Sequence, residues 1–286
     1  MAKNKKHEQQ DEDVGGIAAG EAKSGSVHVS GLRQVPLGAP LFEFLLRLGD
    51  DRLVLGHRLS EWTGHGPILE EDIATANIAL DLIGQAAQLL KLAGEVEGKG
   101  RDEDALAYFR DGTRYRNCLL VEQPNGDFGD TMVRQFLFDA QSVLVWEALA
   151  VSGQSGVAAI AAKALKEGKY HLRHSSEWIV RFGDGTAESH ARVQASLNRF
   201  WRFTGEFFDR DAVDEGVASA GIHVDIGGIK ARWDVMVNDV LARATLTRPA
   251  DGPMQRGGRR GRHSEHLGHL LATMQSVARA HPGASW

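Results

Sequence analysis

The chain has 286 residues, 42% of them hydrophobic, which permits a sizeable globular core. A formal net charge of -5 and a pI of about 6.2 give no reason to expect nucleic acid, which usually requires a basic face. A single cysteine, Cys118, excludes an internal disulfide, and no apolar run approaches the ~18 residues of a membrane span, so we expect a cytoplasmic protein that binds no membrane.

Residues 1–37 are rich in Lys, Glu, Gln, Gly and Ser and contain few large apolar groups. Such a segment buries too little surface to offset its chain entropy, so we predict a disordered leader over 1–37 and an ordered domain over 38–286. The opening sequence MAKNKKHEQQDEDVGG also lacks the apolar run of a signal peptide.

Apolar residues from Leu41 onward recur at i, i+3, i+4 and i+7, the period of an amphipathic helix. The first run reaches Trp62 with one gap at Arg52, and the sequence GHGP ends it. PNGD, SGQSG and FGDGT mark later breaks, and no strand-like alternation is present. Helices are predicted near 41–62, 70–93, 102–121, 129–151, 157–181, 188–209, 227–246 and 263–280. Four of these are long, so the pattern predicts an all-α helical bundle with additional C-terminal helices.

A long helical bundle raises the question of a di-iron site. Di-iron carboxylate proteins take one Glu from each of two helices and a Glu-x-x-His from each of the other two, so that all the side chains project inward. Glu-x-x-His occurs nowhere in this chain, and no nucleophile elbow, P-loop or dinucleotide fingerprint is present. We therefore predict no catalytic residue and no metal site.

Several ionisable side chains nevertheless lie beside the apolar stripes. Asp81 is followed by Gly84 where a His ligand would be needed, and Glu167 has Tyr170 at i+3, with His171 one residue later. A buried charge persists only when it is paired, so we predict a vestigial buried polar network in place of a metal site. Its predicted members are Glu61, Asp81, Asp139, Glu167 and His171.

The segment RDGTRYRN, residues 110–117, combines arginines with an aromatic ring. Arginine forks bind phosphate bidentately and the ring of Tyr115 can stack on a purine, so a nucleotide-tailed ligand such as coenzyme A would suit this segment. A solvated helix face with ordinary ion pairs is the alternative. The predicted substrate-binding residues are Arg114, Tyr115, Arg116 and Asn117.

Two further segments suggest contacts with a partner. His263, His266 and His269 lie three residues apart, and two of them could share a metal, although no cysteine or second carboxylate cluster accompanies them. A helix start that contacts a partner is the plainer interpretation. Aromatic residues crowd the segment 200–208 beyond what one helix face buries, so we predict that this segment and the stretch 263–286 face a partner protein.

Long, specific segments of the chain also support a family assignment. They are LRLGDDRLVLGHRLSEWTGHGPILEEDIATANIALDLIGQA (46–86), LLVEQPNGDFGDTMVRQFLFDA (119–140), KEGKYHLRHSSEWIVRFGDGT (166–186), RFWRFTGEFFD (199–209), HSEHLGHLLATMQ (263–275) and PGASW (282–286). Together they resemble the C subunit of bacterial phenylacetyl-CoA epoxidase, or phenylacetate-CoA oxygenase, over about 41–286.

The resemblance implies a ferritin-like bundle that has lost its metal. It further implies a non-catalytic structural subunit that stabilises the di-iron oxygenase A subunit in aerobic phenylacetate catabolism. At the level of the complex it implies phenylacetyl-CoA as substrate, a small bridging B subunit, and a reductase with NADPH, flavin and an iron–sulfur centre. The missing Glu-x-x-His agrees with the role of the C subunit and argues against the role of the A subunit.

Two other functions remain open on the sequence. A stand-alone acyl-CoA-binding helical bundle would rest on the Arg and Tyr cluster. A stand-alone di-iron or ferroxidase-type enzyme would require complete ligand sets, which the sequence lacks.

Overall fold

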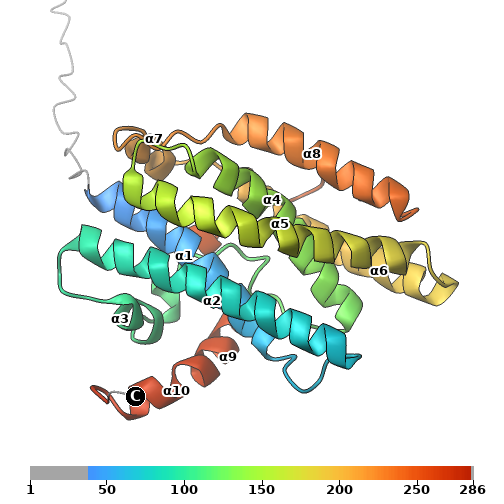
Figure 1. Ribbon diagram of the computed structural model, residues 1–286, viewed down its shortest axis with the longest axis horizontal. Coiled ribbons are helices and arrows are strands. Elements are labelled where there is room, and N and C mark those ends of the chain that lie inside the picture. Colours follow the sequence, from blue (N-terminus) through green and yellow to red (C-terminus); the bar gives the residue numbers. More distant parts are fainter. Residues whose placement is uncertain (1–37, 285–286) are drawn as a thin grey trace, which may run out of the picture. The chain divides into compact units, whose positions relative to one another are not determined.

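The computed structural model describes residues 38–284, and every regular element within that range is a helix (Figure 1). The predicted all-α fold is thereby confirmed, whereas the predicted leader 1–37 lies outside the described residues. Nothing tests the assignment of 38–286 to one domain, which stays a prediction. The long helices are α1 (Gly38–Ser60), α2 (Leu69–Glu97), α4 (Phe128–Leu149) and α5 (Ser155–Gly183).

Shorter helices surround these four. Some follow directly from sequence signals, since Asp102 caps α3 and Asp127 and Thr186 form capping boxes at the starts of α4 and α6. The shorter elements are α3 (Glu103–Tyr108), η1 (Gly112–Arg114), α6 (Ala187–Phe200), η2 (Trp201–Phe208), α7 (Ala212–Ala218), α8 (Ile226–Arg243), η3 (Gly258–Arg260), α9 (Glu265–Met274) and α10 (Ser276–Ala280).

The helices pack as pairs, α1 against α2 and α4 against α5, and α2 also touches α5. Gly56 lets α1 approach α2 closely, because a Cβ at this position would lie 2.8 Å from Ile83 Cγ1 and 3.1 Å from the carbonyl oxygen of Ala79. α4 is the central helix, and all its residues from Thr131 to Trp146 are buried. A helix buried on all sides must also bury its polar residues, so α4 carries interior polar groups.

The predicted helix over 102–121 is wrong beyond Tyr108, where α3 ends. Buried carboxylates take over the backbone N–H groups that a longer helix would have used: Asp50 accepts from Arg116 at 2.8 Å and Asp51 from Cys118 at 2.8 Å. Hydrogen bonds to these two carboxylates thus replace the hydrogen bonds of a helix, so the backbone N–H groups of Arg116 and Cys118 still have acceptors.

The premise that the aromatic segment 200–208 holds more rings than the fold can bury is wrong, because most of the segment is core. Trp201 and Phe207 are buried, with Trp201 packing on Trp233 of α8 at 5.5 Å and Phe207 on Phe138 of α4 at 6.4 Å between ring centroids. The predicted helix over 188–209 changes to a 3-10 helix after Phe200, which turns the rings toward both neighbours.

Candidate functional site: the bundle interior and the arginine-lined cavities

Asp139 of α4 is the carboxyl group of the predicted polar network that is buried most deeply. It is 2% exposed and accepts hydrogen bonds from Gln135 Nε2 at 2.7 Å and Ser175 Oγ at 2.9 Å. Burial raises the pKa of Asp139 to about 7, against the opposing effects of His171 and these two hydrogen bonds. Its hydrogen-bond partners are neutral, so the carboxyl group lies near the balance between its protonated and ionised forms at neutral pH.

His171 and Glu167 of α5 connect this interior to α2. His171, itself buried, lies with Nε2 3.0 Å from Asp81 Oδ2, and the Asp81 side chain is 40% exposed. Gln85 donates to Glu167 Oε2 at 2.9 Å. The structure therefore brings Asp81, Glu167 and His171 to the junction of α2 and α5. Their hydrogen bonds link the interior of the bundle to its surface.

Glu61 does not belong to this set. It is exposed at the end of α1, where it accepts hydrogen bonds from Arg58 at 2.7 Å and from Asn125 at 2.9 Å. The prediction that Glu61 joins a buried network is wrong, because the turn that ends α1 carries it away from the interior.

Arg52 of α1 is an interior residue that sequence reasoning missed. It is 1% exposed, donates to Ser142 Oγ at 2.9 Å, and lies 4.2 Å from the ring centroid of Trp146. Burial lowers its pKa to about 10, although Asp51 and Asp139 act in the opposite direction. The available signal was the run Asp50-Asp51-Arg52 inside an apolar helix, since consecutive positions cannot all point to solvent.

These residues do not fit a di-iron centre. Gln85 stands near the position where α2 would need His, and the interior already holds a guanidinium group that would repel a metal cation. Residues 38–284 contain no group of three or more His, Cys, Asp and Glu side chains arranged to hold a metal ion. Asp139 instead accepts hydrogen bonds from Gln135 and Ser175.

A second buried polar region joins α1 to the chain segments 110–123 and 257–266. Its four members, here called the anchoring carboxylates, are Asp50, Asp51, Glu122 and Glu206, all buried. Asp51 forms a bidentate pair with Arg259 at 3.0 and 2.8 Å, and Asp50 pairs with Arg110 at 3.0 Å. Burial would lower the pKa of Arg259, but the facing Asp51 outweighs it and raises that pKa.

Glu122 and Glu206 complete the anchoring region mainly through backbone groups. Glu122 accepts from the N–H of Ser264 at 2.6 Å and faces His263 at 2.7 Å. Glu206 accepts from the N–H groups of Leu119 and Gly257, each at 2.9 Å. The anchoring carboxylates therefore hold two segments that contain little helix against the bundle.

Of the predicted substrate-binding residues, Arg114 and Arg116 line a surface cavity of about 470 Å³ together with Lys99, Arg101 and Arg110. Arg116 pairs with Glu43, whereas Arg114 is exposed and its side chain makes no hydrogen bond or ion pair with residues 38–284. Lys99 and Arg101 pair with Glu97 and Arg110 pairs with Asp50, so Arg114 is the cation of this lining that could meet an anionic ligand.

Tyr115 and Asn117, the other two, face inward. The Tyr115 hydroxyl donates to the carbonyl of Ala107, and Asn117 Nδ2 donates to Glu122 at 2.9 Å; both side chains are 0% exposed. The expected stack of Tyr115 on a ligand is wrong for this conformation, because the ring is already under the guanidinium of Arg110 at 4.4 Å.

The histidines at 263, 266 and 269 do not come together on one helical face. α9 begins at Glu265, so His263 lies before the helix, where it is held by Glu122 and by the carbonyl of Tyr115 at 3.1 Å. His269 is exposed on α9. The i, i+3 spacing that would let two of these histidines share a metal therefore does not apply to His263.

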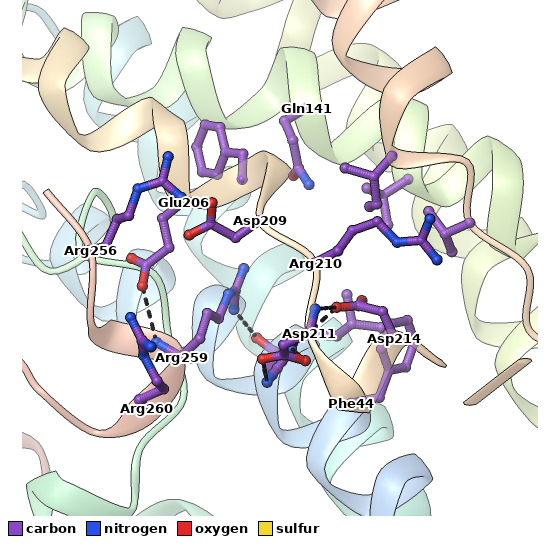
Figure 2. A pocket seen from close by; sticks show the side chains of 16 residues that line it. Phe44, Gln141, Glu206, Asp209, Arg210, Asp211, Asp214, Arg256, Arg259 and Arg260 are labelled. Carbon is purple, nitrogen blue, oxygen red and sulfur yellow. Dashed lines mark hydrogen bonds and ion pairs between the residues drawn. The ribbon is translucent and has the colours of Figure 1, made fainter. Parts of the chain in front are cut away.

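A further cavity, of about 370 Å³, opens between α1, α4 and the segment that follows η2 (Figure 2). Figure 2 shows arginines and carboxylates interleaved around it. Arg47 pairs with Asp211 at 2.6 Å and Arg256 pairs with Asp209, while Arg259 is committed to Asp51. Most of its charges are thus neutralised within the fold.

Comparison with known proteins agrees with the segments quoted from the sequence. A family model described as "Phenylacetic acid catabolic protein" matches residues 37–286. The chain is also 48% identical over 246 residues, 86% of this chain and 99% of the relative, to the C subunit of 1,2-phenylacetyl-CoA epoxidase from Escherichia coli (strain K12). The resemblance stated from the sequence is confirmed.

Proposed function

This chain belongs to the phenylacetic acid catabolic protein family, and from that premise we propose that it is the non-catalytic structural subunit of a phenylacetyl-CoA epoxidase. In this role it keeps a di-iron oxygenase subunit folded and active in aerobic phenylacetate catabolism. Its relative in Escherichia coli is the C subunit of 1,2-phenylacetyl-CoA epoxidase.

The observation that carries the proposal is the interior of the bundle. A guanidinium from α1 and a carboxyl group with neutral partners from α4 occupy the region where four inward ligand sets would be required. A bundle with such an interior has no evident redox chemistry of its own, so its contribution to the enzyme lies in its surface and its fold.

The remaining components belong to the complex. The oxygenase subunit would supply the di-iron centre, a reductase would supply electrons from NADPH through flavin and an iron–sulfur centre, and a small subunit would bridge the assembly. Phenylacetyl-CoA would be bound at the level of the complex, in the cytoplasm.

Co-expression tests this role directly. The oxygenase subunit should be poorly soluble or inactive alone, and this chain should restore both solubility and epoxidation, measured by size-exclusion chromatography and by product formation. This chain with reductase and NADPH but without the oxygenase subunit should convert no phenylacetyl-CoA. An oxygenase subunit that is fully soluble and active by itself contradicts the proposal.

Metal analysis adds an independent measurement. After anaerobic reconstitution with iron, the isolated chain should hold well under one iron per chain. Two tightly held irons would contradict the non-catalytic role.

A second candidate function is binding of the coenzyme A portion of an acyl-CoA, either within the complex or by this bundle alone. It is favoured by the surface cavity that contains Arg114 and Arg116, because Arg114 has no partner among the described residues. A well-formed charge-assisted hydrogen bond contributes about 1.5–3 kcal/mol.

The double variant Arg114→Ala/Arg116→Ala should raise the apparent KM of the complex for phenylacetyl-CoA roughly tenfold, if one such contact is lost. Arg243→Ala is the matched control, since Arg243 is an exposed arginine on α8. An unchanged KM in an intact complex rejects this assignment and leaves the structural role standing.

A further inference from the structure

The outward face of α2 carries an apolar stripe that no other part of residues 38–284 covers. Leu69, Ile73 and Leu80 are 71%, 54% and 67% exposed. Gly84 and Ala87 continue the stripe, and a Cβ at Gly84 would meet nothing within 4 Å. These positions follow helical spacing and lie on one side of α2, with the exposed Asn77 between Ile73 and Leu80.

This helix is apolar on two sides. Its inner side packs on α1, while Leu69, Ile73 and Leu80 face outward. By length and composition alone α2 could cross a membrane. A surface helix normally presents charged and polar groups outward, and contiguous exposed apolar surface instead marks an interaction site.

Beside this stripe, α5 presents cations. Asp81 of α2 is bonded to His171 of α5, so the two helices form one two-helix face. Lys166, Tyr170 and Arg173 lie on the outward side of α5 and are exposed. Arg173 lies 5.5 Å from the Tyr170 ring, and within residues 38–284 neither Lys166 nor Arg173 forms an ion pair.

We propose that this two-helix face, defined by Leu69, Ile73, Leu80, Lys166 and Arg173, is the docking surface for the oxygenase subunit. The partner would contribute a helix whose apolar side chains cover α2 and whose acidic side chains meet the cations of α5. The inference rests on the proposed structural role, and it replaces the aromatic segment 200–208 as the expected contact.

Asp81 favours a protein partner over a lipid surface. Its carboxylate is 40% exposed at the edge of the apolar stripe. A carboxylate carried into hydrocarbon is costly, whereas protein interfaces accommodate polar groups by hydrogen bonding. An apolar centre with a charged margin is also the usual composition of such interfaces.

Charge insertion tests the surface. Leu80→Glu should weaken binding to the purified oxygenase subunit by about tenfold or more, as truncation of a central interface residue does. Val235→Glu is the matched control, because Val235 is 71% exposed on α8, and it should bind as the wild type does. Both variants should melt like the wild type, since neither position is buried. Lys166→Glu/Arg173→Glu should lower the association rate and its dependence on salt.

The outcomes separate this inference from the proposed function. If the wild type binds the oxygenase subunit and Leu80→Glu binds equally well, the docking surface is wrong and the structural role survives. If the wild type does not bind at all, the structural role itself fails. Two results would overturn the proposal, both with binding to the oxygenase unchanged in Leu80→Glu. If the variant no longer binds anionic vesicles that the wild type binds, the face belongs to a membrane. If the variant no longer forms a homodimer that the wild type forms, the face belongs to a second copy of the chain.

A labelling experiment locates the contact. Cys118 is the chain's single cysteine and is buried, so a cysteine introduced at Leu80 would be the reactive thiol. The rate at which maleimide labels Leu80→Cys should fall at least about tenfold in the complex, while Val235→Cys should label at the same rate alone and in the complex, as expected for positions inside and outside an interface. Equal protection of both positions, or of neither, would contradict the proposal.

Discussion

Asp51 and Asp139 are two carboxyl groups buried to almost the same extent, 3% and 2% exposed, in different chemical surroundings. Asp51 meets the guanidinium of Arg259 in a bidentate pair, whereas Asp139 is hydrogen-bonded by Gln135 and Ser175. Burial alone does not decide whether a carboxyl group stays charged. The partner decides, because a full opposite charge compensates desolvation better than neutral donors do.

The two regions also hold different parts of the chain. Asp51 and the other anchoring carboxylates fasten the segments 110–123 and 257–266, which have little helix of their own. Asp139 joins α4 to α5, which already pack along their lengths. Ion pairs therefore hold the segments that lack helix packing, and removing an ion pair there should lower the stability of the protein most.

The largest effect is expected for Arg259→Ala. It removes the bidentate partner of buried Asp51 and leaves only the more distant Arg52 at 3.9 Å, so the free energy of unfolding should fall by about 3–5 kcal/mol, measured by urea denaturation. Arg260→Ala is the control, because the exposed Arg260 forms no ion pair within residues 38–284, and it should change stability by less than about 0.5 kcal/mol. If both variants lowered the free energy of unfolding equally, the buried Asp51–Arg259 pair would have no special role in stability.

A smaller loss is expected for His171→Ala in the interior. It leaves Asp81 without its hydrogen-bond partner and opens a polar gap beside Asp139, so unfolding should become easier by about 1–3 kcal/mol. Lys169→Ala, an exposed change on the same helix, is the control. Activity of the complex should fall only through lost assembly, and a stable, assembled His171→Ala complex without turnover would instead point to direct chemistry.

A pH-dependent effect is expected for Asp139→Asn. The folded pKa of about 7 lies above the usual value of about 3.9, so between these values the folded state binds more protons than the unfolded state. Asp139 therefore makes the wild type less stable as pH rises, by about 1 kcal/mol between pH 6 and pH 8. The wild type should lose this amount relative to Asp139→Asn in urea titrations at the two pH values, and parallel pH profiles would show that Asp139 is charged throughout.

The smallest effect is expected for Arg192→Ala. Arg192 pairs with Glu188 at 3.0 Å, but its side chain is 62% exposed, so solvent screens the pair. Stability should change by about 0.5 kcal/mol or less. A loss comparable with that of Arg259→Ala would show that burial is not what gives the Asp51–Arg259 pair its weight.

The sequence alone determined the class of fold and the family. Helical periodicity from Leu41 onward predicts that these segments are helices, and the absence of Glu-x-x-His is a property of the sequence itself. Periodicity does not decide which side of α2 is buried, since Ile73 and Leu80 are 54% and 67% exposed. The fold class and the missing motif required only local spacing, and the family was assigned from the resemblance of long segments, so tertiary contacts could not alter them. The breaks at GHGP and PNGD fall between helices in the structure, and SGQSG contains the residue, Ser155, at which α5 begins.

Only the tertiary structure decided where polar and aromatic groups go. The segment after Tyr108 was predicted to be helical, but the buried carboxylates of Asp50 and Asp51 accept hydrogen bonds from its backbone N–H groups. The aromatic segment 200–208 has the composition of an interface, but α4 and α8 bury it, and the exposed apolar stripe lies on α2 instead. Local spacing cannot reveal these choices, because hydrogen bonds and apolar contacts between residues far apart in the chain compete with local ones and are settled only when the helices pack.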